Sequence, residues 1–341
     1  MVCLRLVLAG LGVVGRSLVE LIAARREELV RYYGLALRIV AVGDRSGVVA
    51  GRHGLNPENV LDAKRRGRLK ELGEAETRFS DMLEALDNVD ADIFIDATPT
   101  NIKDGEPSYS MIRKATLRGM NIVTVNKGPL ALAFPAIAEL AERRGVMLRF
   151  SGTVGGGMPV LEFAKECARA DEITQIEGIL NGTTNYILTQ MEDTGLSFAE
   201  ALKQAQDKGY AERDPSLDVK GLDTACKLVI LANAVLKLKT TLADVNITGI
   251  EEVTQEEVRE AKREGKVIKL IGRASDELTV KPERIPANDT LNVKEAMNAV
   301  RFTTRYSGRH TITGRGAGGY ETATAILRDV IAVKQRVISE V

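Results

Sequence analysis

Apolar positions recur along this chain in two different patterns. Up to residue 150, short apolar runs of strand length alternate with helical stretches in which apolar residues recur every three or four positions. Buried strands separated by helices of this length predict a doubly wound parallel sheet. The apolar runs lie at residues 2–9, 37–43, 91–97, 121–125 and 145–151.

Beyond residue 150 the pattern of apolar positions changes. Helical stretches come first, two of them opened by the capping patterns Ser197-x-x-Glu200 and Thr254-x-x-Glu257. Alternating runs follow at 267–274, 277–282, 298–306 and 310–314, which predict antiparallel strands. A sheet of this kind, outside the first domain, is a natural surface for a homodimer. A glycine turn then leads into a last amphipathic helix, which we expect to return to the first domain. The predicted domains are 1–150 plus 316–341, and an inserted α+β domain at 151–315.

A glycine motif stands between the first strand and the first helix. Gly10, Gly12 and Gly15 form G-x-G-x-x-G in the strand, turn, helix context that gives this spacing its meaning. Gly10 permits the turn, Gly12 admits a pyrophosphate close to the backbone, and Gly15 allows close packing of the helix. The first domain is therefore predicted to be a Rossmann-type dinucleotide-binding domain.

Other candidate cofactor residues stand where predicted strands end. Asp44 suits the ribose hydroxyls of NAD, whereas its neighbour Arg45 suits the 2′-phosphate of NADP, and both cofactors stay open. Thr98 and Lys127 follow two later strands. Because ligands bind parallel sheets at the carboxyl ends of the strands, these residues are predicted to share one site.

An acidic stretch at residues 209–227 precedes an apolar helical run. In a helix, Asp223 and Lys227 would stack one turn apart beside an apolar stripe. They could hold a substrate ammonium and transfer a proton. They could instead form an Asp-rich helix start followed by an ordinary surface ion pair.

Composition removes several other classes of function. Lys plus Arg and Asp plus Glu number 47 each, so the net charge predicts neither a nucleic-acid nor a membrane partner. Cys3, Cys167 and Cys226 form no CxxC pair, which favours a reducing, cytoplasmic setting. Only His53 and His310 are available for histidine chemistry. No apolar run reaches the length of a membrane span.

Taken together, the motifs resemble the homoserine dehydrogenase family over essentially the whole chain. The resemblance implies NAD(P)-dependent interconversion of L-homoserine and L-aspartate 4-semialdehyde, on the route to threonine, isoleucine and methionine. Its most specific parts are the NGTTNYIL run and the D-x-x-G-x-D-x-x-x-K pattern ending at Lys227. The matching segments are 10–15, 96–101, 123–132, 153–159, 180–191, 209–227 and 316–319.

The resemblance also implies residue roles. Lys227 would be the proton donor and acceptor for the substrate oxygen, assisted by Lys127. Glu212, Asp218 and Asp223 would bind the substrate. The implied cofactor contacts, with those argued above from the glycine motif and the strand ends, are Gly10, Gly12, Val13, Val14, Gly15, Asp44, Arg45, Thr98, Lys127, Gly209 and Gly318.

One position departs from the family pattern. Many members carry at position 151 a glutamate that helps to bind a sodium ion, and this chain has Ser151. The backbone carbonyls of Val154, Gly156 and Met158 remain candidate ligands for the ion. The chain stops after the returning helix, so we expect no carboxy-terminal regulatory domain and no threonine inhibition through one. The alternatives are another two-domain NAD(P) amino-acid dehydrogenase and a non-catalytic dinucleotide-binding regulator.

Overall fold

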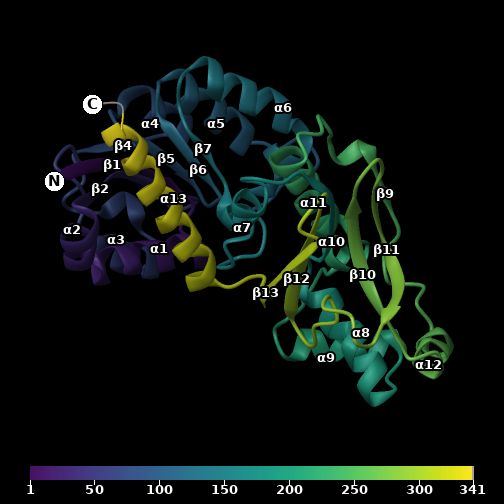
Figure 1. Cartoon of the computed structure of the whole chain (residues 1–341). Coiled ribbons are helices and arrows are strands. Elements are labelled where there is room, and N and C mark those ends of the chain that lie inside the picture. The colour runs from purple at the N-terminus through teal and green to yellow at the C-terminus, as the bar shows by residue number, and fades with distance from the viewer. Residues whose placement is uncertain (340–341) are drawn as a thin grey trace. The chain divides into compact units, whose positions relative to one another are not determined.

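The computed structural model describes residues 1–339 and divides into two compact units (Figure 1). The first unit comprises residues 1–153 and the chain from Gly318 onward, and the second comprises Val154–Ala317. No described helix has the combination of length and apolar character needed to cross a membrane.

A seven-stranded sheet forms the centre of the first unit. Five strands are parallel, which confirms the doubly wound prediction, while the short strands β3 and β4 add an antiparallel edge beside β2 that was not predicted. The strand order is β4-β3-β2-β1-β5-β6-β7. The strands are β1 Val2–Ala9, β2 Leu35–Asp44, β3 Gly47–Ala50, β4 Thr77–Phe79, β5 Ile93–Asp96, β6 Asn121–Thr124 and β7 Leu148–Arg149.

Helices cover both faces of this sheet (Figure 1). The last helix, α13, packs along α1, and both share one apolar core with Leu6 and Leu8 of β1. This side has α1 Val13–Ala24, α3 Pro57–Arg65 and α13 Gly319–Ser339. The other face carries α4 Met82–Asn88, α5 Ser108–Leu117 and α6 Lys127–Arg143.

The first helical segment differs from its prediction. The long spacing between Gly15 and Asp44 favours a single first helix through residue 33, but α1 ends at Ala24 and α2 occupies Arg26–Tyr33. Arg25 between them has φ −103° and ψ 13°, outside helical geometry, so the chain turns there. The polar sequence at residues 52–59 favours a loop, yet α3 begins at Pro57 because the Asn56 side chain caps it.

The second unit is built on a six-stranded sheet. Neighbouring strands are antiparallel, as predicted, except for the unpredicted β9, which runs parallel to β11. Their order is β13-β12-β8-β10-β11-β9. The strands are β8 Ile173–Ile179, β9 Val245–Ile247, β10 Lys266–Ala274, β11 Leu278–Pro286, β12 Met297–Thr304 and β13 Arg309–Arg315.

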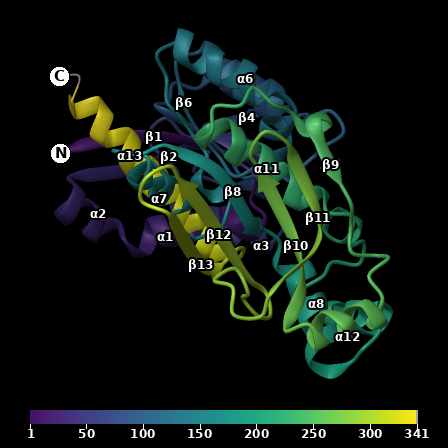
Figure 2. The ribbon, with the colours of Figure 1, turned by 45° about the vertical axis from the view of Figure 1, so that its right-hand side comes forward.

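Helices also flank the second sheet. The helices α7 and α11 pack on one face, while α8 lies against the other and contacts α12 (Figure 2). Both predicted capping boxes, at Ser197 and Thr254, are present at the starts of α9 and α12. The helices are α7 Val160–Cys167, α8 Gly182–Thr194, α9 Phe198–Asp207, α10 Ser216–Val219, α11 Leu222–Val235 and α12 Gln255–Arg263.

Candidate active site

The glycine loop of the first unit has the geometry that its spacing predicts. Gly10 adopts φ +96°, a conformation that side chains disfavour, and a Cβ there would collide with the Ala97 carbonyl. A Cβ at Gly15 would collide with the Gly10 carbonyl, so the glycine lets α1 approach the turn. Gly12 differs from both because a Cβ there would meet nothing within 4 Å. The open position is therefore the one assigned to a ligand.

Helix α1 begins at this loop without a side-chain cap. Gly12 is its N-cap and provides no side-chain acceptor for the first-turn N–H groups. Val13, the first helical residue, is 63% exposed. Uncapped N–H groups at the positive end of a helix dipole bind anions, so this end suits a pyrophosphate.

Asp44 lies at the end of β2, where a ribose-binding acid was predicted. Its carboxylate accepts hydrogen bonds from Ser46 N at 2.7 Å and Ser46 Oγ at 2.6 Å, and it pairs with Lys64 of α3. Burial raises the pKa of Asp44, but the Lys64 and Ser46 hydrogen bonds outweigh it and lower the pKa overall. Arg45 beside it is exposed. Sequence reasoning missed Lys64, whose only signal was its place in a basic helical stretch.

The backbone N–H and the hydroxyl of Thr98 donate hydrogen bonds to the fully buried carboxyl group of Asp96. Asp96, at 0% exposure, accepts hydrogen bonds from Thr98 N and Oγ1 and from the hydroxyls of Ser108 and Thr124. Asn126 then donates its amide to Thr98 Oγ1 at 3.0 Å. Burial raises the pKa of Asp96, and these hydrogen bonds offset only part of the effect. The network ties the ends of β5 and β6 together.

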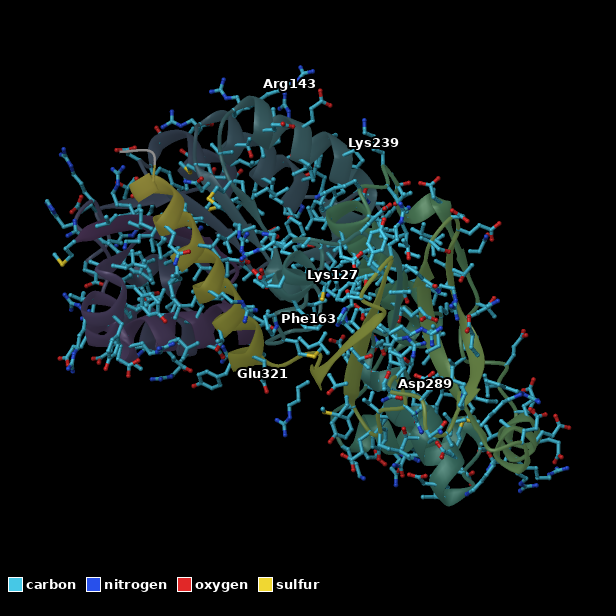
Figure 3. The ribbon with its side chains drawn as sticks, in the orientation of Figure 1. Lys127, Arg143, Phe163, Lys239, Asp289 and Glu321 are labelled. Carbon is cyan, nitrogen blue, oxygen red and sulfur yellow. The ribbon has the colours of Figure 1, made fainter. Side chains whose placement is uncertain are left out.

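Lys127 follows directly as the first residue of α6 (Figure 3). Asn126 caps the helix by accepting from Gly128 N at 3.0 Å. A Cβ at Gly128 would collide with the Asn101 carbonyl, so the helix start packs closely on the loop after β5. Lys127 is partly buried at this position. The Asp96 network and this cap thus place Thr98 and Lys127 on one framework.

The end of the chain contributes to the same unit. Gly318 adopts φ +137° immediately before α13. A Cβ at the next residue, Gly319, would lie 2.8 Å from Val13 Cγ1 and from Ser17 Oγ, so α13 starts against the first turn of α1. Glu321 lies in the first turn of α13 (Figure 3). Gly318 is therefore close in the fold to the uncapped end of α1.

The second unit holds the predicted acid–lysine pair on α11. Lys227 Nζ lies 2.8 Å from Asp223 Oδ2 and donates to the Leu180 carbonyl at 2.6 Å. Lys227 is only 7% exposed. The surface-pair alternative is therefore wrong, because an ordinary surface ion pair leaves both side chains in solvent.

Asp218 joins this pair through a residue that was not predicted as part of the site. Asn181 Nδ2 donates to Asp218 Oδ1 at 2.6 Å and to Asp223 Oδ2 at 2.9 Å. Burial raises the pKa of Asp218, and the negative charge of Asp223 raises it further. Asn181 also caps α8, because its Oδ1 accepts from Thr184 N, whereas the sequence favours Thr183 or Thr184 as the cap.

Comparisons with known proteins place this arrangement in a family. The sequence model described as "Homoserine dehydrogenase" matches residues 159–331, and the one described as "Homoserine dehydrogenase, NAD binding domain" matches residues 10–151. The chain belongs to the homoserine dehydrogenase family. It is an NAD(P)-dependent oxidoreductase that interconverts L-homoserine and L-aspartate 4-semialdehyde, as predicted.

Individual homoserine dehydrogenases match over almost the full chain. The protein of Methanocaldococcus jannaschii is 39% identical over 96% of this chain and 98% of its own length. The NAD(+)-dependent homoserine dehydrogenase of Pseudomonas canavaninivorans is 41% identical over 97% and 96% of the two chains. A hyperthermophilic archaeal homoserine dehydrogenase in complex with NADPH has a TM-score of 0.86 and 26% identity, covering 98% of both chains.

Two residues of the expected homoserine dehydrogenase site lie on the loop between α9 and α10. Glu212 is exposed, and it makes neither of the two Asn181 hydrogen bonds that join Asp218 to Asp223. Gly209 is also exposed and adopts φ +75°. Thr183 Oγ1 anchors the loop by donating to the Tyr210 carbonyl at 2.7 Å. The loop is thus attached to α8, while Glu212 stands outside the hydrogen-bonded cluster.

The position that departs from the homoserine dehydrogenase pattern is occupied by a different polar contact. Ser151 donates from N at 2.8 Å and from Oγ at 2.7 Å to Asp329 of α13, which also pairs with Arg149 at 3.0 Å. In the second unit, the Met158 carbonyl accepts from Val160 N at 2.9 Å. The residues that the structure describes include no cluster of three or more His, Cys, Asp or Glu side chains suited to a metal.

Proposed function

We propose that Lys227 is the proton donor and acceptor of this homoserine dehydrogenase, and that Asp218 and Asp223 bind the substrate ammonium. The observation that carries the proposal is the largely buried ion pair between Lys227 and Asp223. Asp218 lies beside this pair, because Asn181 donates a hydrogen bond to each of the two acids. A lysine in such a place can transfer a proton to or from an alcohol oxygen.

The charges of the cluster fit the substrate. With Asp218 and Asp223 ionised, the cluster carries a net charge of −1 when Lys227 is protonated and −2 when Lys227 is neutral. Burying uncompensated charge is unfavourable, so the cluster favours a ligand that brings one positive charge. L-Homoserine and L-aspartate 4-semialdehyde both carry an ammonium group.

Lys227 has a defined task in each direction of the reaction. In oxidation, the hydroxyl proton of homoserine passes to a neutral Lys227 amine, while carbon 4 loses a hydride. In reduction, the Lys227 ammonium donates its proton to the forming alkoxide. The Leu180 carbonyl and Asp223 hold Nζ in place for both directions. When bound, the nicotinamide supplies or accepts the hydride.

The first unit is proposed as the cofactor-binding domain. The uncapped start of α1 and the open face of Gly12 fit a pyrophosphate. Asp44 favours ribose hydroxyls, whereas Arg45 and the neighbouring Lys64 supply positive charge for a 2′-phosphate, so both coenzymes are to be tested. The proposed contacts are Gly10, Gly12, Val13, Val14, Gly15, Asp44, Arg45, Thr98, Lys127, Gly209 and Gly318.

The second unit would serve as the catalytic and dimerisation domain, with Lys127 assisting Lys227 and Glu212 contributing to substrate binding. We propose a cytoplasmic homodimer that acts in threonine, isoleucine and methionine biosynthesis. A sodium ion at the carbonyls of Val154, Gly156 and Met158 would lack the charged ligand of the family, because Ser151 stands in place of the glutamate.

Oxidation of L-homoserine, monitored by nicotinamide absorbance, tests the proposed function. The purified protein is incubated with NAD⁺ and, separately, with NADP⁺. Each reaction is run in sodium chloride and, for comparison, in potassium chloride. We expect homoserine-dependent formation of reduced cofactor with at least one coenzyme. D-Homoserine and L-threonine serve as substrate controls. Absence of reduced cofactor at high enzyme concentration would contradict the proposal.

A further inference from the structure

One side chain holds the acidic cluster together, and no motif identified it as part of the chemistry. Asn181 follows β8, caps α8 and is 5% exposed. Its contacts reach across 37 positions to Asp218 and 42 positions to Asp223. We propose that Asn181 is a positioning residue, which fixes the two carboxylates and through Asp223 fixes Lys227. The inference rests on the proposed function and adds a residue to it.

Hydrogen-bond chemistry permits only one orientation of the Asn181 amide. Its Oδ1 accepts from Thr184 N at 2.9 Å, and its Nδ2 donates to Asp218 and Asp223. Rotating the amide by 180° would place an oxygen against two carboxylates and an NH₂ group against a backbone N–H. Both contacts would be repulsive, so the network itself assigns the orientation.

The asparagine side chain meets the hydrogen-bonding requirements of this position. The site needs one acceptor for the helix start and two donors for the carboxylates. Aspartate supplies acceptors only, and serine can cap the helix but has a single hydroxyl donor. Lysine or arginine would cancel the net negative charge that the substrate ammonium needs. A neutral amide therefore joins Asp218 to Asp223 without changing the charge of the cluster.

Three adjoining segments meet at this amide. Lys227 Nζ contacts both Asp223 and the Leu180 carbonyl, which belongs to the residue immediately before Asn181. At Gly182, the next residue, a Cβ would lie 2.7 Å from the Ala296 carbonyl, so the start of α8 has no room to shift in that direction. Gly221 adopts φ +79° and makes the turn between Asp218 on α10 and Asp223 on α11. Asn181 thus links a rigid helix start to the two acids on either side of that turn.

The test uses two substitutions that keep an acceptor for the cap. Asn181→Asp and Asn181→Ser both rank among good helix caps, so α8 should still form. Each loses the paired donation to Asp218 and Asp223. Asn56→Asp is the matched control, because Asn56 caps α3 by accepting from Glu58 N at 2.8 Å and is exposed. Thermal midpoints and reduced-cofactor binding are measured for all three variants.

Steady-state kinetics then separate positioning from capping. We expect both Asn181 variants to raise KM for L-homoserine by at least about tenfold, as loss of hydrogen bonds to charged groups does. Cofactor affinity should stay within about twofold, and the acid limb of kcat/KM should move to higher pH because Asp218 loses a donor that favours its charged form. Asn56→Asp should change none of these values. A wild-type KM and acid limb in both Asn181 variants would overturn the proposal.

A second measurement does not depend on turnover. Carbon-13 labelling of aspartate carboxyls, assigned with Asp218→Asn, follows the titration of Asp218 by NMR. The pKa of Asp218 should be higher in Asn181→Ser than in the wild type. An unchanged titration would overturn the inference even if homoserine is oxidised. Wild-type protein that titrates as expected but oxidises no homoserine would refute the proposed function and leave the positioning role standing.

Discussion

Aspartates lie in the candidate sites of both units, but the groups that surround their carboxylates differ between the two sites. Asp96 in the first unit is fully buried, and its partners are hydroxyl and backbone N–H groups. No lysine or arginine of the described chain contacts it. Asp223 in the second unit is shared by a lysine and an amide, with Asp218 beside it.

This difference separates a framework from a reactive site. An aspartate surrounded by neutral donors with no cation fixes the loops around it, and burial favours its neutral form. Two aspartates with one lysine keep a net charge that a cationic ligand can compensate. Removing charge should therefore abolish chemistry at the second site and alter mainly stability at the first.

The largest expected effect comes from removing the lysine. Lys227→Ala should lower kcat by about a thousandfold or more, the range of general acid–base catalysis, with cofactor affinity nearly unchanged. The measurement is initial rate together with binding of reduced cofactor. Lys203→Ala is the matched control, because Lys203 pairs with Asp207 one turn away in solvent at 3.1 Å. Near-normal turnover in Lys227→Ala would contradict the assigned role.

Asp218 should control substrate affinity and its pH dependence. Burial and the charge of Asp223 raise the pKa of Asp218. Substrate binding should therefore weaken, as pH falls, at a higher pH than for an ordinary aspartate. Asp218→Asn should raise KM for L-homoserine by about tenfold to a hundredfold and remove that part of the acid limb. Asp214→Asn is the control, because the wild-type Asp214 carboxylate is exposed and accepts a hydrogen bond from Ser216. It should leave KM and the acid limb unchanged.

Asp96 should affect stability more than catalysis. Asp96→Ala leaves three hydroxyls and one N–H without their acceptor and should lower the free energy of unfolding by about 2 kcal/mol or more. Asp96→Asn should cost less at neutral pH, because it resembles the neutral form that burial favours.

The pH dependence gives the sign of this effect. Because the folded pKa is raised, the native state holds a proton that the unfolded chain releases. Wild-type stability should therefore fall relative to Asp96→Asn as pH rises from about 4 through the folded pKa. Urea unfolding of both proteins at several pH values checks this, and parallel curves would contradict it.

A smaller effect is expected from a buried lysine that belongs to neither site. Lys269 of β10 is 0% exposed and donates to Asn185, Thr189 and the Val293 carbonyl, and burial lowers its pKa to about 8. The native state therefore binds fewer protons than the unfolded chain between about pH 8 and 10.5. This contribution to stability rises across that range and is lost as pH falls through 8.

Replacing Lys269 should remove that rise. Lys269→Met should give a flatter dependence of unfolding free energy on alkaline pH than the wild type. Lys266→Met is the control on the same strand, because the Lys266 side chain is partly in solvent and pairs with Glu264. Equal slopes in all three proteins would show that Lys269 titrates normally.

Short-range patterns carried much of the site. The roles proposed for Gly10, Gly12 and Gly15 follow from backbone geometry over six residues. The structure shows a steric reason for glycine at Gly10 and Gly15 and open space at Gly12. Asp223 and Lys227 are likewise one helical turn apart, so helix periodicity alone brings them together. The parallel sheet was predictable because each strand and helix has its own apolar period.

Contacts between distant segments were beyond the reach of those patterns. Lys64 meets Asp44 across 20 positions, and Asp96 meets Thr124 across 28. The sequence alone favours Thr183 or Thr184, rather than Asn181, as the cap of α8. Only the fold shows that its amide faces two acids from another part of the chain.

The sequence therefore determined the parts whose partners lie within a few residues: the glycine loop, the acid–lysine pair and the strand–helix order. Tertiary structure decided which charges are buried, which are shared and which remain in solvent. Asp223 and Lys227, which the sequence alone allows to be a surface pair, are largely buried in the fold, whereas Glu212 is exposed. The physical reason is that desolvation depends on every segment packed around a group, whereas periodicity reports only on the segment that contains it.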